Sequence, residues 1–307
     1  MRAIFGPPTS TKGALAYGGI SLLLLFVAPI TILSWSEERL YRPYINPHVY
    51  HNPTSVIVKP LALILMVYAV YALRPTVQNI KPLAQSAWLP AAAIILATIS
   101  KPNYTMCLLP ALLIVAIWRR LRGRPMNEYV LIAGFLLPGV ATLGWQYFLS
   151  KGSNQAGGSI LFDPMHVASI RLSGLQPEAL WLPGALLLSC LFPLCVTLIY
   201  RKQAANSVWL KLSWLVFIIG LGFYYLLAEG GWRMTHGNFV WGAQTALLVL
   251  FAVALAFFVA QHPALLMLKR PPLTRGFVIC SVVLVLHLIS GVIYYLNYAA
   301  FDRAWYY

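Results

Sequence analysis

Apolar runs long enough to cross a membrane recur along the chain, and short polar connectors separate them. Such runs predict transmembrane helices, because only helices and closed barrels satisfy their backbone hydrogen bonds inside hydrocarbon. We expect about nine spans, at residues 14–35, 56–73, 86–100, 104–118, 129–149, 181–200, 208–227, 240–260 and 277–297. The predicted fold is therefore all-α, a polytopic transmembrane helical bundle.

No part of the chain is long and polar enough for a soluble domain, so residues 1–307 are expected to form a single integral membrane domain. Arg2 and Lys12 precede the first apolar run, and no small-residue cleavage site follows it. This pattern predicts a retained first span rather than a removed signal peptide.

Residues 86–118 form one apolar stretch that is interrupted at Lys101-Pro102-Asn103. At about 1.5 Å per residue this stretch is too long for one untilted span, whereas it divides into two short ones. We interpret it as a hairpin with its tip outside the cell. The alternative is a single broken helix, which would reverse the orientation of every span before it.

The composition is typical of a membrane protein, since 60% of the residues are hydrophobic and only 9% are charged. Soluble domains carry about a quarter charged residues, so this chain has too few to cover a surface in water. The net charge of +15 comes largely from basic clusters in the connectors, as at residues 119–124, 201–202 and 269–275. Such clusters hold connectors in the cytoplasm during insertion, and no nucleic acid partner is expected.

The distribution of charge predicts a cytoplasmic N-terminus and an external C-terminus, because most of the 22 basic residues then lie in cytoplasmic connectors. Of the seven acidic residues only Glu128 would face the cytoplasm, and four of the six histidines would lie outside. Side chains that can transfer protons or bind ligands are therefore expected to gather on the outer side.

The first outer loop, residues 36–55, carries two acids, Glu37 and Glu38, with arginines, histidines and tyrosines. A carboxylate here would act as a general base while the arginines neutralise a phosphate. The tyrosines are better explained as anchors at headgroup depth. For His51 and Asn52, at the mouth of the next helix, a binding role and a role in the interface both stay open.

Lys101 lies beside a proline break between two short spans. Its ammonium group would present a positive charge to an anionic headgroup. On the sequence alone we prefer the alternative, in which the side chain snorkels from a helix end to the interface.

The loop between the spans at 208–227 and 240–260 carries Glu229, Arg233, His236 and Asn238, which are spaced by glycines. Glycine permits a tight or left-handed backbone, so these side chains can converge on one ligand. Arg233 would bind a phosphate in a fork geometry, and Glu229 and His236 would exchange protons. The alternative is a polar hairpin closed by a Glu229–Arg233 ion pair. We favour the functional site over the polar hairpin, because ionisable groups at membrane helix ends are costly without a role.

Other motifs are few. The four cysteines all lie inside apolar runs, without paired C-x-x-C spacing, so neither a disulfide framework nor a zinc site is indicated. Walker, dinucleotide-binding, H-E-x-x-H and nucleophile-elbow patterns do not occur. Residues 150–180 are expected to be a connector, with a lid over a lipid substrate as the alternative. His287 is expected to be a packed core residue rather than a proton relay.

Three segments together resemble patterns in bacterial multi-span proteins related to the GT-C glycosyltransferases. They are YHNPTSVIVKPLAL (Tyr50 to Leu63), SKPNYTMCLLPAL (Ser100 to Leu112) and EGGWRMTHGNFVWG (Glu229 to Gly242). The resemblance implies a polyprenyl-phosphate-linked sugar donor, transfer on the outer face of the bacterial inner membrane, and inversion at the sugar carbon. There is one departure. GT-C enzymes usually place a catalytic aspartate in the first outer loop, where this chain has only Glu37 and Glu38.

The resemblance leads to a hypothesis of glycosyl transfer for envelope polysaccharide or glycolipid assembly. The candidate catalytic residues are Glu37, Glu38 and Glu229, and the candidate substrate-binding residues are Arg233, His236, Asn238, His51, Asn52 and Lys101. The expected partners are a lipid-linked sugar, membrane lipids and other membrane proteins. A divalent metal ion is left open as a cofactor, although no metal-binding motif is present.

Two other classes of function stay open. A non-catalytic subunit or scaffold of a membrane complex would keep these polar residues apart, with no cleft between them. A transporter would need ionisable residues at mid-membrane, usually in paired halves of the chain. No internal repeat is visible in the sequence.

Overall fold

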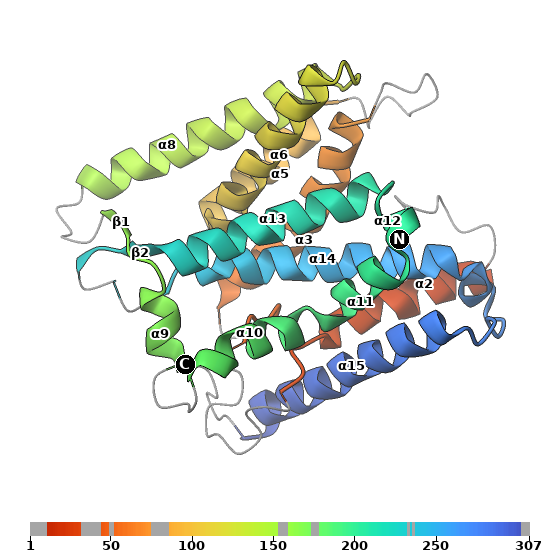
Figure 1. Cartoon of the computed structure of the whole chain (residues 1–307). Helices are drawn as coiled ribbons and strands as arrows, with labels where there is room; N and C mark the ends of the chain where they lie inside the picture. The colour runs from red at the N-terminus through yellow and green to blue at the C-terminus, as the bar shows by residue number, and fades with distance from the viewer. Residues whose placement is uncertain are drawn as a thin grey trace. The chain divides into compact units, whose positions relative to one another are not determined.

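The computed structural model describes residues 11–31, 44–48, 52–74, 86–152, 159–172, 178–231, 234 and 237–301 (Figure 1). Six helical segments in this part of the chain are long and apolar enough to cross a membrane. They are α3 (Pro53–Ala72), α6 (Asn103–Leu121), the segment Glu128–Leu149, α13 (Val208–Leu226), α14 (Val240–Gln261) and α15 (Arg275–Phe301). The protein is thus an integral membrane protein with an all-α fold.

A seventh span results if the bent pair α10 (Glu178–Ser189) and α11 (Leu191–Ile199), which turns by 70° at Cys190, crosses as one. The described residues thus show six or seven spans, and the nine expected from the sequence stay a prediction. The two other predicted spans correspond to short apolar helices, α2 (Thr11–Leu23) with its continuation η1 (Leu24–Phe26), and α5 (Trp88–Ser100). A helix of 13 residues such as α5 is about 20 Å long, shorter than the roughly 30 Å of hydrocarbon in a bilayer.

The remaining elements are short. The third candidate span consists of α7 (Glu128–Leu131), the π-helical turn η3 (Ile132–Leu136) and α8 (Leu137–Gly152). Among the described residues, strand β1 (Ile160–Phe162) pairs antiparallel with β2 (Leu227–Glu229), with Ile160 opposite Glu229. The other elements are α9 (His166–Leu172), α12 (Arg201–Ala204) and η5 (Pro263–Met267).

The chain divides into two compact units. Unit 1 contains residues 1–48, 171–211 and 250–307, and unit 2 contains residues 49–170 and 212–249. Helices α13 and α14 contribute a part to each. The expectation of a single membrane domain stays a prediction.

In unit 2, α5 and α6 form a helical hairpin that packs beside α3 and α8 (Figure 1). A Cβ atom added at Gly139 of α8 would lie 3.0 Å from Ile94 of α5 and 2.9 Å from Leu109 of α6. In one straight helix these two residues would be about 22 Å apart. The hairpin expected at Lys101 is therefore present, and the single broken helix is excluded. The sidedness of its tip stays a prediction.

In unit 1, an extended segment after η1 lies between α15 and α10. The Ala28 N–H donates to the His287 carbonyl at 3.2 Å, and the Ile30 N–H donates to the Leu188 carbonyl at 3.1 Å. Ser290 donates its hydroxyl to the Pro29 carbonyl. Backbone that is not helical is tolerated at membrane depth only where protein satisfies it. These hydrogen bonds satisfy polar backbone groups of residues 28–30.

The bend between α10 and α11 has a partner on α15. The Phe192 N–H, near the start of α11, donates to His287 Nε2 at 3.3 Å, so His287 Nδ1 carries the proton and donates to the Ala28 carbonyl at 2.6 Å. The ring also packs edge-on against Phe251, 5.0 Å between centroids. His287 is therefore a buried, neutral core residue, as the sequence predicted.

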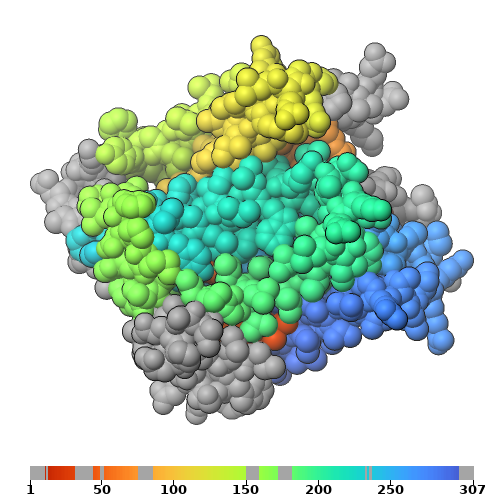
Figure 2. Space-filling model, viewed as in Figure 1, coloured from red at the N-terminus to blue at the C-terminus, as the bar shows by residue number. Residues whose placement is uncertain are grey.

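Apolar side chains cover much of the helix surface, as expected for contact with lipid. On α15, which is visible in blue in Figure 2, they include Ile279, Val282 and Ile289, each about half exposed. Tyr44 lies in the described part of the first loop, and only 1% of its surface is exposed. It is thus a core residue of unit 1, and its interpretation as a headgroup anchor is wrong.

Candidate functional site

The candidate site lies in unit 2, where the tip of the α5–α6 hairpin meets the start of α14. Helix α5 ends at Ser100, and Lys101 adopts an extended backbone while its N–H still donates to Ala97. Pro102 then precedes the first residue of α6, Asn103. Proline has no N–H to donate and fixes φ near the helical value. The sequence Lys-Pro-Asn therefore stops one helix and starts the next.

A chain of hydrogen bonds joins Asn103, Asn238 and Glu229. Asn103 Nδ2 donates to the backbone carbonyl of Asn238 at 2.9 Å, and Asn238 Nδ2 donates to Glu229 Oε2. All three residues are half-buried. Glu229 is the last residue of β2, so its backbone is held in place by its pairing with Ile160 of β1. The carboxylate is oriented from two directions, by the strand and by the asparagine amide.

Glycines shape the loop that carries this chain. Gly231 and Gly237 adopt φ angles of 70° and 64°, the left-handed region that glycine occupies without steric cost. The Gly230 N–H donates to the Ser159 carbonyl at 2.7 Å, which ties the loop to the residues before β1. The expectation that glycines allow a tight loop here is confirmed at these positions.

The ammonium group of Lys101 lies over the indole ring of Trp241, with Nζ 3.6 Å from the ring centroid. This is a cation–π contact, which gains strength as water is excluded. The side chain is half-buried, and the loss of water around it lowers the pKa of Lys101 to about 8. Among the described residues, no carboxylate lies within ion-pair distance of Nζ. The side chain is a partly desolvated cation on an aromatic face, and its snorkelling to the interface stays a prediction.

Close packing of α14 on α6 brings these groups together. A Cβ atom at Gly242 would lie 2.7 Å from Cys107 Sγ and 3.0 Å from the Asn103 carbonyl. The Cys107 thiol donates to that same carbonyl at 3.1 Å. Small residues at such a contact let membrane helices approach closely. Gly242 is therefore what allows Trp241 and Asn238 to reach the hairpin tip.

The structure brings together three of the predicted site residues, Glu229, Asn238 and Lys101, through Asn103 and Trp241. Asn52 has a local role instead, because its Oδ1 caps α3 by accepting from the Ser55 N–H at 3.1 Å and from the Thr54 hydroxyl at 2.7 Å. The other predicted site residues lie outside the described residues: Glu37, Glu38, His51, Arg233 and His236.

Sequence reasoning missed two parts of this arrangement and one buried charge. The bridging role of Asn103 had only a weak signal, an amide at the start of a helix after proline. Trp241 lies under Lys101, and its signal was only an aromatic residue near the start of a span. Lys59 is buried within α3, and its signal was a lysine inside an apolar run. Ionisable residues inside membrane helices are often functional.

The long loop before α10 is held to unit 2 at its described end. Strand β1 pairs with β2, and the Met165 N–H donates to the Tyr225 carbonyl at 2.6 Å. His166 Nδ1 lies 3.1 Å from Asp163 Oδ2. Residues 160–166 are therefore held to α13 and β2, while the choice between a connector and a lid for residues 150–180 stays open.

Among the described residues, no group of three His, Cys, Asp or Glu side chains gathers in a way that could hold a metal ion. The chain matches no protein-family model, and comparison with curated proteins and with solved structures gives no match either.

Proposed function

We propose that the chain is a membrane glycosyltransferase similar to the GT-C enzymes, which transfers a sugar from a polyprenyl phosphate on the outer face of the membrane. The observation that carries the proposal is the position of Lys101. A desolvated cation without a described carboxylate partner lies beside the hydrogen-bonded chain that ends at Glu229. A phosphate and a hydroxyl are the two groups that this pair would bind.

The roles follow from the chemistry of the two groups. The Glu229 carboxylate accepts the proton of the acceptor hydroxyl, and the hydroxyl oxygen attacks the anomeric carbon of the sugar. The bond between that carbon and the phosphate oxygen breaks, and the lipid phosphate leaves with the electron pair. Lys101 stabilises the negative charge that develops on the phosphate. Asn238 positions the carboxylate and does not itself react.

A non-catalytic subunit of a membrane complex is the second candidate, and one observation favours it. The Glu229 carboxylate is already engaged by the Asn238 amide, so the loop can satisfy its own polar groups. In that case the three side chains would stabilise the loop, and no substrate would contact them.

Replacing Glu229 by glutamine separates these two functions. The side-chain oxygen of glutamine still accepts the hydrogen bond from Asn238, but the amide cannot accept a proton from a hydroxyl. We expect Glu229→Gln to fold as the wild type does and to lower glycan assembly in cells at least 100-fold, the range attributed to a general base. Glycan is measured against protein amount in the membrane fraction.

The matched control is Glu128→Gln. Glu128 is exposed and pairs with Arg120 at the start of α7, away from the hairpin tip. This variant is expected to keep wild-type glycan levels. Full glycan assembly with Glu229→Gln would contradict catalysis by this carboxylate and support the non-catalytic subunit.

A further inference from the structure

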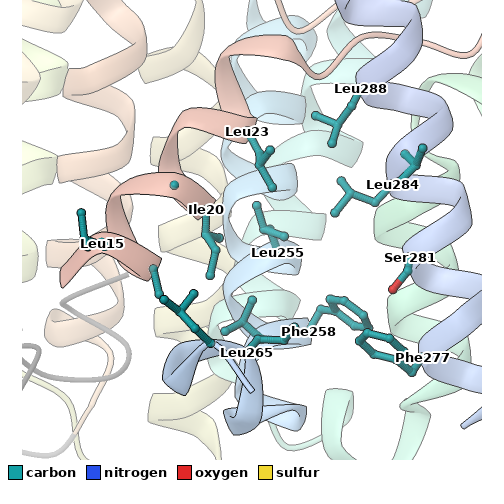
Figure 3. A pocket seen from close by; sticks show the side chains of 15 residues that line it. Leu15, Ile20, Leu23, Leu255, Phe258, Leu265, Phe277, Ser281, Leu284 and Leu288 are labelled. Carbon is teal, nitrogen blue, oxygen red and sulfur yellow. The ribbon is translucent and has the colours of Figure 1, made fainter. Parts of the chain in front are cut away.

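Unit 1 contains an apolar cavity of about 530 Å³, lined by α2, the end of α14, η5 and α15 (Figure 3). Leucine and phenylalanine side chains line it from all four elements, among them Leu15, Leu255, Leu265 and Phe277. Ser281 supplies the one hydroxyl of its lining. A volume of this size is typical of a site for a small ligand, and its walls fit hydrocarbon.

The rim of the cavity is basic. Leu268 lines the cavity and is followed directly by Lys269 and Arg270, and Arg275 lies two residues before the lining residue Phe277. All three basic side chains are exposed. The sequence from residue 250 to residue 301 contains no acidic residue. Protein carboxylates of this stretch therefore cannot neutralise the rim, and an anion from outside the chain can.

The backbone at the rim supports the same conclusion. Leu268 is one of two non-glycine residues with positive φ in the described part of the chain, at 53°. Its strained turn is closed by the Lys269 N–H, which donates to the Ala264 carbonyl at 2.9 Å. The turn places Leu268 at the cavity while 61% of its surface stays exposed. This left-handed residue is the C-cap of η5, and it leaves the Leu268 side chain open at the cavity, where an apolar ligand can contact it.

The connector from η5 to α15 has the composition of a membrane interface. Met267, Leu268 and Leu273 are largely exposed apolar residues, and they alternate with the basic residues of the rim. At the boundary between water and hydrocarbon, apolar side chains with cationic groups beside them attract anionic lipids. The rim is therefore suited to headgroup depth, and the cavity beneath it is suited to the depth of the acyl chains.

We propose that this cavity binds one acyl chain of an anionic phospholipid, whose phosphate is held by Lys269, Arg270 and Arg275. The site is separate from the candidate site in unit 2 and does not depend on the proposed transferase activity. Each basic residue is expected to strengthen binding by about five-fold, the contribution of a lysine or arginine near an anionic surface.

The test uses the full chain purified in detergent, with native mass spectrometry to count bound lipids. Phosphatidylglycerol and phosphatidylcholine with the same acyl chains are added in parallel. We expect the wild type to retain phosphatidylglycerol at least ten-fold more strongly. The variant Lys269→Gln/Arg270→Gln/Arg275→Gln is expected to lose that preference and still to retain both lipids weakly.

A second pair of variants tests the cavity itself. Ser281→Trp fills it, whereas Val282→Trp adds the same side chain at the neighbouring position, which is exposed and does not line the cavity. Ser281→Trp is expected to abolish retention of either lipid, and Val282→Trp is expected to leave it unchanged. If Ser281→Trp does not yield folded protein, Ser281→Leu takes its place with a several-fold loss expected.

Three results would overturn the proposal. Equal retention of the two lipids by the wild type would show that the basic rim does not select an anionic lipid. Unchanged retention by the cavity-filling variant would place the lipid elsewhere. A dimer that dissociates with Ser281→Trp, whatever lipid is present, would show that a second copy of the chain occupies the cavity.

Discussion

At the scale of single residues, the environment of Lys101 determines what its charge can do. The indole of Trp241 beneath Nζ favours the ammonium form, while burial opposes it and brings the pKa to about 8. The charge is thus present at neutral pH but is lost within a modest rise in pH. A phosphate that binds there would restore the cation, because an adjacent negative charge raises the pKa of a lysine.

This shift predicts a stability effect with a definite sign. Between the folded pKa of about 8 and the usual lysine value near 10.5, the unfolded chain binds more protons than the folded one. The free energy of unfolding should therefore rise with pH across this window. Below pH 8 both states hold the proton, and the cost of burying the charge is fully present.

Thermal unfolding in detergent between pH 7 and pH 10.5 measures the effect, with Lys101→Met as the reference. The melting temperature of the wild type is expected to approach that of Lys101→Met as the pH rises, because methionine carries no charge to bury. Parallel curves for the two proteins would show that Lys101 does not change its pKa on folding.

At the scale of elements, two glycines mark where backbones come closest. In unit 1, a Cβ atom at Gly291 of α15 would lie 1.5 Å from the carbonyl oxygen of Phe26, which immediately precedes the extended segment 27–31. In unit 2, Gly242 permits the contact of α14 with α6. Each close approach positions one of the hydrogen-bonded arrangements described above.

Gly291→Ala is predicted to be strongly destabilising, because the new methyl group meets backbone that cannot move without breaking the hydrogen bonds at Ala28 and Pro29. Overpacking of this kind costs about 1–3 kcal/mol, and lost buried hydrogen bonds add to it. The control is Gly18→Ala in α2, where nothing lies within 4 Å of the added Cβ atom. It should be neutral or raise stability by up to about 1 kcal/mol. Similar melting temperatures for the two variants would contradict the packing of segment 27–31 on α15.

Gly242→Ala is predicted to separate α14 from the hairpin tip and to lower stability by about 1–3 kcal/mol. Part of the loss should be recovered in the double variant with Cys107→Ala, because the thiol is one of the two groups that the new methyl group meets. A double-mutant cycle on melting temperature measures this coupling. Strictly additive effects would indicate that the two residues are not in contact.

The sequence predicted the helices well and their breaks unevenly. Hydropathy and the proline at Pro102 located the hairpin of α5 and α6, because both signals are local. The bend at Cys190 has a local signal in Pro193, which lacks the N–H that would bond the Ser189 carbonyl. Its contact with His287 had no such signal, because that residue is distant in sequence and meets the bend only by tertiary packing. Likewise, Glu229 and Asn238 could be grouped because they share a loop, whereas their link to Asn103 depends on the packing at Gly242.

At the scale of the whole molecule, the two units present different chemistry. Unit 2 carries the polar site at the hairpin tip, and unit 1 carries the apolar cavity with its basic rim. Both features can bind a lipid that bears a phosphate. Unit 2 offers a single desolvated cation, and unit 1 offers a cavity for an acyl chain. The central claim is that Lys101 in unit 2 binds the phosphate of a polyprenyl phosphate.

Binding of polyprenyl phosphate to the purified full chain tests this claim most directly. Affinity is measured by the thermal shift on titration at pH 7, with Lys101 present and with Lys101→Met. Both proteins also carry the triple glutamine substitution described above, so that the basic rim of unit 1 does not bind the phosphate. A hydrogen bond or ion pair to a charged group contributes about 1.5–3 kcal/mol, so Lys101→Met should weaken binding by at least ten-fold. Equal affinity of the two proteins would contradict the account.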